Sequence, residues 1–397
     1  MLTRRSLFRS STAAVAVGFV PFPMLASDQS SGAARMPIAA GVDPELRAGL
    51  RELHRRGAHW LLAQQQPNGS FLPDHPYALG VTQLAILALA GGGAGLEAQS
   101  PQIAAAATFM ERHRRKDGGW EQAGSGTGLY TTALGLQVEA CLGRATSPAA
   151  QSQLLANQKP AHGGIATTPG GFATAPNAAP DLHASVSAIE GLVASGVPAG
   201  HPNLQRARRF LNACQNLDSG DGEPGDRAWV THDGGGVYSP DPAVADGHDD
   251  PTLDGGPSRP ASTGSLSCGL LAGFLLVGMD VQHPRTKAVQ RWIQANYRIT
   301  GHPGMPVGRQ QQGLFGYWLA LAKAMALTGT NRIELSDGRQ ADWRADLLET
   351  ARAQAQVMAP GTSAPMRWAN AAPRWGEALP QLATAYVLRA IAIAADA

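Results

Sequence analysis

The chain has few cysteines, few aromatic residues and no marked excess of either charge. Its three cysteines, Cys141, Cys214 and Cys268, lie inside helical patterns, so we expect buried thiols, with one disulfide as the alternative. Lysine and arginine number 32 against 30 acidic residues, and no basic stripe is visible, so no nucleic-acid partner is expected. Beyond the N-terminal region no run is apolar and long enough to span a membrane. Because 44% of the 397 residues are hydrophobic, the chain can bury a large core.

The N-terminal residues have the order of an export signal. Arg4 and Arg5 precede an apolar run at 11–26, and polar residues follow. The arginine pair resembles a twin-arginine signal, which sends folded proteins across a membrane. A membrane anchor is the alternative, but the run is shorter than the ~20 residues that a span needs. We therefore predict an export signal at 1–26, a linker at 27–43 and a periplasmic protein.

Twelve later segments have helical periodicity, in two alternating kinds. The amphipathic kind, with apolar residues on one side and charges on the other, is found at residues 44–65, 100–116, 148–158, 202–215, 284–298 and 341–358. The other kind, apolar on nearly every side, is found at residues 77–90, 128–142, 182–195, 264–278, 313–327 and 379–394. Strand signals are few.

This alternation predicts two concentric rings of helices. A helix that is apolar on all sides must be covered on all sides, so the apolar kind should form the inner ring. Six helical hairpins would close an all-α (α/α)6 toroid, while an open helical solenoid is the alternative. We expect a single toroid domain over residues 44–397, with a loop insertion at about 217–262.

A short motif recurs between the two kinds of helix. Its best copy, residues 55–71, reads RRGAHWLLAQQQPNGSF, and residues 107–120 repeat the plan with Arg114 in the glutamine position. The Gln65 side chain can bond backbone groups at helix ends, and Gly69 permits a turn where a Cβ would clash. Phe71 can then stack on the preceding repeat. We interpret the motif as a structural link, with a ligand site as the alternative.

The motif resembles the repeat shared by squalene–hopene cyclases and protein prenyltransferases. The matching residues are Arg56, Gly57, Trp60, Leu61, Gln65, Gly69 and Phe71. The resemblance covers about residues 44–395 and is closest to exported bacterial prenyltransferase/squalene-oxidase repeat proteins. Segments such as GLYTTALGLQ (128–137) and QQGLFGYW (311–318) extend it. It implies the terpenoid cyclase-like toroid fold and no settled reaction.

Loop lengths indicate where a site would lie. Loops from outer to inner helices are long, at about 159–181, 216–262 and 359–378, and in a closed toroid they emerge at one end. We predict the site at the mouth of the lumen at that end. Polar residues expected there are Asp74, His75, Asp181, His183, His232, Asp233, Tyr238, His248, Asp249, Asp250, Arg374 and Glu377.

Nine residues are the candidate site residues. The candidate catalytic acids are Asp233, Asp181 and Glu377. The candidate substrate-binding residues are His75, Tyr130, His183, Tyr238, Tyr317 and Trp318. The alternative for each loop polar residue is a surface group or a helix cap, and Asp181 stands where an N-cap is expected.

Metals and cofactors are not predicted. The acidic loop at 217–256 could hold Ca²⁺, but its carboxylates have no regular ligand spacing, which favours a solvated loop. The zinc set of protein prenyltransferases is incomplete, because Cys268 has no aspartate two residues before it. The Asp-x-Asp-Asp motif of class II terpene cyclases is absent, since DGHDD at 246–250 has an extra residue.

Three functions fit this pattern. The first is a terpene-cyclase-like protein that acts on or binds an isoprenoid or other hydrophobic small molecule in the lumen, with one acid at the end of an apolar cavity. The second is a non-catalytic toroid that binds a lipid or a protein partner. The third is a carbohydrate-active enzyme with paired carboxylates about 5–10 Å apart. The resemblance favours the first.

Overall fold

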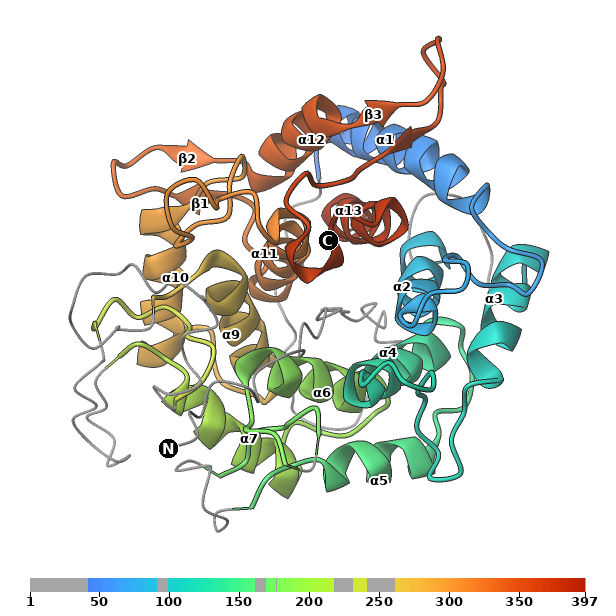
Figure 1. Cartoon of the computed structure of the whole chain (residues 1–397). Helices are drawn as coiled ribbons and strands as arrows, with labels where there is room; N and C mark the ends of the chain where they lie inside the picture. The colour runs from blue at the N-terminus through green and yellow to red at the C-terminus, as the bar shows by residue number, and fades with distance from the viewer. Residues whose placement is uncertain are drawn as a thin grey trace, which may run out of the picture.

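A computed structural model describes residues 42–90, 99–160, 169–175, 177–217, 231–240 and 261–396. The export signal at 1–26, nearly all of the linker, and most of the insertion at 217–262 lie outside these residues. Within them, twelve α-helices form two concentric rings (Figure 1). No helix in the described part of the chain is long and apolar enough to cross a membrane.

The inner ring is closed. Its helices are α2 (Ala78–Ala90), α4 (Gly128–Cys141), α6 (Leu182–Ala194), α9 (Gly264–Leu276), α11 (Leu314–Thr328) and α13 (Pro380–Asp396). Each contacts the next in this order, and α13 also packs against α2. The predicted toroid is therefore confirmed over the open solenoid, whose end repeats would not meet.

The outer ring covers the inner one from outside. It consists of α1 (Pro44–Leu62), α3 (Pro101–Glu111), α5 (Pro148–Ala156), α7 (Pro202–Ala213), α10 (Pro284–Asn296) and α12 (Trp343–Gln354). Five of these helices begin with a capping side chain and then proline, which suits the first helical position. The five caps are Asp43, Ser100, Ser147, His201 and His283. These local signals explain why the sequence pattern placed the helices within a few residues of their bounds.

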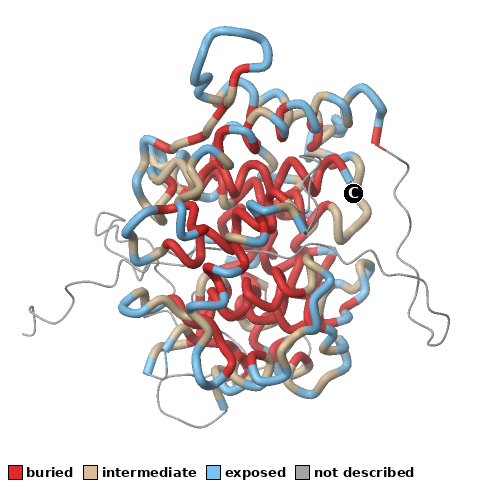
Figure 2. The backbone as a smooth tube through the Cα atoms, turned by 90° about the vertical axis from the view of Figure 1, so that its right-hand side faces the viewer, coloured by how far each residue is buried: buried red, intermediate tan, exposed pale blue. Residues whose placement is uncertain are grey.

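The core lies in the inner ring. Every residue of α2 except Ala90 is buried, and the inner helices form the buried centre of the molecule (Figure 2). Four short strands lie at the periphery as two antiparallel hairpins, β1 (Ile333–Glu334) with β2 (Gln340–Ala341) and β3 (Gln356–Val357) with β4 (Met366–Arg367). A 3-10 turn, η1 (Arg374–Gly376), precedes α13. The three cysteines, all within the described residues, form no disulfide.

Glutamine side chains tie neighbouring repeats together. The Gln65 Nε2 donates to the carbonyl of Gly69 at 3.2 Å and to the carbonyl of Gln102, in the first turn of α3, at 2.8 Å. The same pair of bonds recurs in two later repeats, from Gln158 to Gly170 and Asn203 and from Gln215 to Gly234 and Arg285. Each glutamine thus links its own turn to the next outer helix.

A second bond fixes each of these loops to its inner helix. The backbone N–H of Phe71, the aromatic residue of the motif, donates to the Thr82 hydroxyl on α2 at 3.1 Å. Equivalent bonds join Trp120 to Thr132, Phe172 to Ser185, Gly236 to Ser267 and Trp368 to Thr384. The repeated bond holds the loops at the N-terminal ends of the inner helices, which is the end that the loop lengths indicate.

Candidate functional site

Asp181 lies at the N-terminus of α6 and is only 4% exposed. Its Oδ1 accepts the backbone N–H of Ala184 at 2.8 Å, so it caps the helix as expected. The Tyr238 phenol also interacts with this carboxylate and lowers its pKa. Burial raises the pKa of Asp181 to about 6, although the hydrogen bonds oppose the shift. A fraction of the molecules therefore keep the proton on this carboxyl near neutral pH.

Two tyrosines from different elements interact with Asp181. Tyr130 on α4 is buried, and its hydroxyl has no hydrogen-bond partner among the described residues. Burial and the Asp181 charge raise the pKa of Tyr130, and the Tyr238 and Tyr386 phenols contribute. Tyr386 belongs to α13, which is separated from α4 by α2 in the ring. We call Tyr130, Asp181 and Tyr238 the acid cluster.

Glu377 is the second buried carboxyl at this end of the ring. Its Oε1 accepts the backbone N–H of Gly316 at 2.8 Å, and its Oε2 accepts the Asn370 side-chain N–H at 2.8 Å. Burial raises the pKa of Glu377 to about 7. These bonds hold the loop before α13 against the first turn of α11, so Glu377 stabilises the packing of this loop.

Asp233 is exposed and shapes a turn. Its Oδ1 accepts the N–H of Gly235 at 2.8 Å and the Ser262 hydroxyl at 2.7 Å. Asn68 and Asp117 accept the N–H two residues on in the same way in the first two copies of the motif. Asp233 is therefore an exposed turn residue, and we do not propose it as the acid.

Of the histidine and aromatic candidates, His183 lies beside the acid cluster, whereas Tyr317 and Trp318 lie on α11. His183 lies beside the acid cluster, with its ring 6.0 Å from that of Tyr238, and burial lowers its pKa. Tyr317 stacks on His302 at 5.3 Å near the start of α11. Trp318 belongs to the packing between the rings instead, because its indole N–H donates to the Ile299 carbonyl just after α10, at 2.8 Å.

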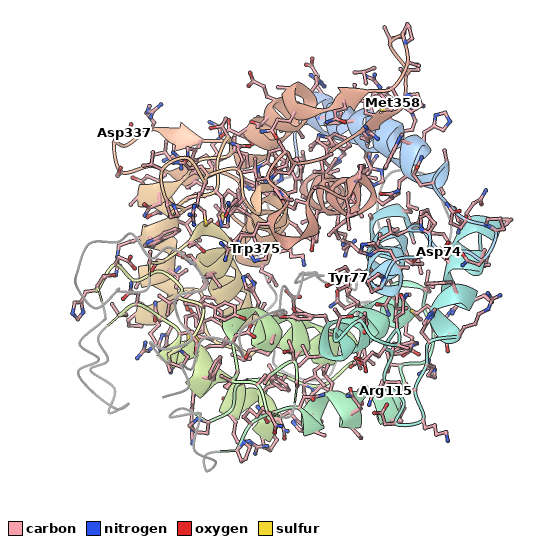
Figure 3. The ribbon with its side chains drawn as sticks, in the orientation of Figure 1. Asp74, Tyr77, Arg115, Asp337, Met358 and Trp375 are labelled. Atoms are coloured by element: carbon pink, nitrogen blue, oxygen red, sulfur yellow. The ribbon has the colours of Figure 1, made fainter. Side chains whose placement is uncertain are left out.

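Two aromatic residues lie toward the centre from opposite sides (Figure 3). One is Tyr77, whose backbone N–H donates to Nδ1 of His75 at 3.2 Å. The other is Trp375, which sequence analysis did not select. Its φ of 57° is a strained value for a bulky residue, and strain of this kind is concentrated at functional sites. Arg374 stacks over its ring at 4.8 Å.

Several sequence candidates lie elsewhere. Asp74 and His232 are exposed loop residues with positive φ. His248, Asp249, Asp250 and most of the acidic loop at 217–256, the candidate Ca²⁺ site, lie outside the described residues.

A layer of buried charges, which sequence analysis missed, lies farther along the inner helices. Glu190 on α6, Lys323 on α11 and Arg389 on α13 are each at most 4% exposed. The Lys323 Nζ lies 4.0 Å from Oε1 of Glu190, although α9 separates their helices in the ring. Burial raises the pKa of Glu190 and lowers that of Lys323, and the opposite charge partly offsets both shifts. We call these three residues the charged layer.

The charged layer and the acid cluster are separated along the ring axis. Asp181 and Glu190 are nine residues apart at the start and toward the end of α6, which corresponds to roughly 13 Å of helix. Tyr386 and Arg389 are three residues apart on α13, so they share a face of that helix. The inner helices thus present an acidic, tyrosine-rich level and a charged level.

Solved structures share this architecture. A variant of the type II terpene cyclase MstE from Scytonema, bound to its substrate geranylgeranyl dihydroxybenzoate, matches 89% of this chain and 99% of its own, with a TM-score of 0.56 and 13% identity. The same cyclase with the product merosterolic acid A gives 0.54 over 89% and 99%, with 14% identity. A glycosidase variant gives 0.50 over the same shares, also with 14% identity.

These likenesses define the class of the fold. At 13–14% identity they establish the α/α toroid that terpene cyclases and glycosidases share. No protein-family model and no curated protein sequence matches the chain.

Proposed function

We propose that the protein is a terpene-cyclase-like enzyme that acts on an isoprenoid or other hydrophobic small molecule in the toroid lumen, with Asp181 as the proton donor. The acid cluster is the observation that supports this proposal. It combines a buried carboxyl whose pKa is raised to about 6 with Tyr130 on α4 and Tyr238 in the segment between α7 and α9. The terpene cyclase neighbours add support at the level of the fold.

The proposed chemistry begins with proton transfer to an alkene. The carboxyl proton of Asp181 moves to one alkene carbon, the π electrons form the new C–H bond, and the other carbon becomes a cation. Aromatic faces such as that of Tyr130 can stabilise such a cation. Ring closure relocates the charge, and loss of a proton ends the reaction, so the product is an isomer of the substrate.

Asp181→Asn is expected to abolish conversion while leaving binding intact. Asparagine also caps helices well, so α6 keeps its start, but the amide has no proton to donate. The purified full-length protein would be incubated with squalene, geranylgeraniol or geranylgeranoic acid, and isomers of unchanged mass would be sought by gas chromatography and mass spectrometry. Wild-type conversion should fall as the pH rises through about 6, because Asp181 loses its proton there.

The matched control is Asp337→Asn, because Asp337 is exposed on the peripheral β1–β2 hairpin (Figure 3). It should convert substrate at the wild-type rate. Binding without conversion by the wild type would indicate a non-catalytic lipid-binding toroid. Cleavage of an oligosaccharide, with no isoprenoid bound, would favour the carbohydrate-active alternative.

We also propose that the protein works outside the cytoplasm, on the basis of the signal-like residues 1–26. Changing Arg4 and Arg5 together to lysine should keep the full-length precursor in the cytoplasm, since the twin-arginine route reads the arginine pair. Cell fractionation and immunoblotting would measure this. Equal periplasmic amounts of the wild type and the double variant would exclude the twin-arginine route.

A further inference from the structure

The charged layer contains an arginine edge with no partner in the described protein. The Arg389 side chain is buried, and its Nη1 donates to the Leu87 carbonyl on α2 at 3.0 Å. Its Nε and Nη2 have no hydrogen-bond partner among the described residues. These two nitrogens form one edge of the planar guanidinium, with two N–H groups side by side. That is the geometry that binds both oxygens of a carboxylate.

Polar atoms on other inner helices are unpartnered as well. In the described chain, both ends of the Gln137 side chain on α4, Oε1 of Gln83 on α2 and Oγ of Ser187 on α6 have no hydrogen-bond partner. All three residues are buried. Native proteins leave few buried polar groups unsatisfied, so several on adjoining inner helices indicate that a ligand or water bonds to them.

The charges of the three residues in the charged layer favour a singly charged anion, and the Asp396 carboxylate, which also acts on Arg389, already pairs with Arg51 at 3.5 Å. When ionised, Lys323 and Arg389 contribute two positive charges and Glu190 contributes one negative charge. One carboxylate on the Arg389 edge would make this layer neutral, which matters because buried net charge is costly. A phosphate monoester would bring more negative charge than the layer can balance.

We propose that the charged layer binds the carboxylate of an apolar acid, with the Nε–Nη2 edge of Arg389 bonding both of its oxygens. The apolar chain of the ligand then extends along the ring axis toward the acid cluster, roughly 13 Å away. This inference deepens the proposed function and rests on it for the isoprenoid nature of the chain. It specifies the substrate as a carboxylic acid rather than an alcohol or a hydrocarbon.

The test compares ligands that differ only at the head group. Geranylgeranoic acid, geranylgeraniol and the methyl ester of the acid would be titrated into the full-length protein by calorimetry, with palmitate as an acid of different chain and geranylgeranyl monophosphate as the phosphate arm. The wild type should bind the acid about tenfold or more tightly than the alcohol and the ester. The monophosphate should bind more weakly than the acid.

Arg389→Lys keeps the positive charge but removes the two-nitrogen edge. It should reduce the preference for the acid to less than about threefold and leave the affinity for the alcohol unchanged. Arg339→Lys is the matched control, because Arg339 is exposed on the β1–β2 hairpin, and it should keep the full preference.

Equal binding of acid and alcohol by the wild type would overturn the proposal even if the variant does not fold, and would indicate that water satisfies the Arg389 edge. A preference that survives Arg389→Lys would overturn it too, as would tighter binding of the monophosphate. Binding of palmitate alone would retain the carboxylate site and refute the isoprenoid function. Binding of all the isoprenoids without an acid preference would retain the isoprenoid function and refute the carboxylate site.

Discussion

Gly69→Ala is expected to lower the free energy of unfolding by about 3 kcal/mol or more. Gly69 has a φ of 93°, and an added Cβ would lie 2.2 Å from the carbonyl oxygen of Ala105 on α3. The loop would have to move away from the next outer helix, which would also stretch the Gln65 bond to Gln102. Urea unfolding followed by helical circular dichroism would measure the loss.

Gly124→Ala is the matched control for this change. Gly124 also has a positive φ, 76°, but an added Cβ would meet nothing within 4 Å. It should lower the free energy of unfolding by about 1 kcal/mol, which is the cost of the positive φ alone. Similar losses for the two variants would show that the close approach of the turn to α3 contributes nothing to stability.

Glu190→Gln is expected to destabilise the protein by about 3–5 kcal/mol. It removes the single carboxylate of the charged layer and leaves Lys323 and Arg389 buried without a counter-charge. Lys323→Met should cost less than half as much, because Glu190 and Arg389 still balance each other. Chemical denaturation of both variants at pH 7 would test this asymmetry.

One result would contradict the expected difference between the Glu190 and Lys323 variants. Equal losses for Glu190→Gln and Lys323→Met would mean that the Glu190–Lys323 pair, and not the charge balance of all three residues, sets the stability. The double variant would then be close to wild type, since replacing both members of a buried pair is often nearly neutral.

Helix positions could be predicted from the sequence because they follow from local signals. The apolar α2 can only be an inner helix, and the Ser100–Pro101 pair marks the start of α3. The third copy of the motif is degenerate in the sequence, with Gln158 and Gly170 12 positions apart where Gln65 and Gly69 are four apart. Only their hydrogen bond identifies them as a pair.

Sequence patterns identify some of the residues of the proposed site more readily than others. Asp181 stands out in the sequence as a cap, but its burial and its tyrosine neighbours depend on α4 and the segment at 231–240 packing beside α6. Asp233 is a turn residue that could have been recognised, since Asp117 occupies the same place in the second copy of the motif. Loop lengths predicted a site at one end of the ring, and they gave no indication of the charged side chains farther along the inner helices.

The residues of the charged layer can be recognised in the sequence. Glu190 and Lys323 are the only acidic or basic residues of α6 and α11 apart from His183, and Arg389 lies in the middle of an apolar stretch of α13. Charged residues are almost never fully buried unless they are paired. Lone charges on three apolar helices therefore indicate that their side chains meet.

The closure of the ring has a consequence for how the protein is made. α13 packs against α1 and α2, and Nε of Arg47 on α1 donates to the carbonyl of Ala395 at 3.1 Å. The inner face of α1, the first described helix, is therefore covered only when α13, the last helix, packs against it. During synthesis the growing chain remains an open arc with apolar helix faces exposed, and a ribosome must translate more than three hundred further codons before α1 meets its partner.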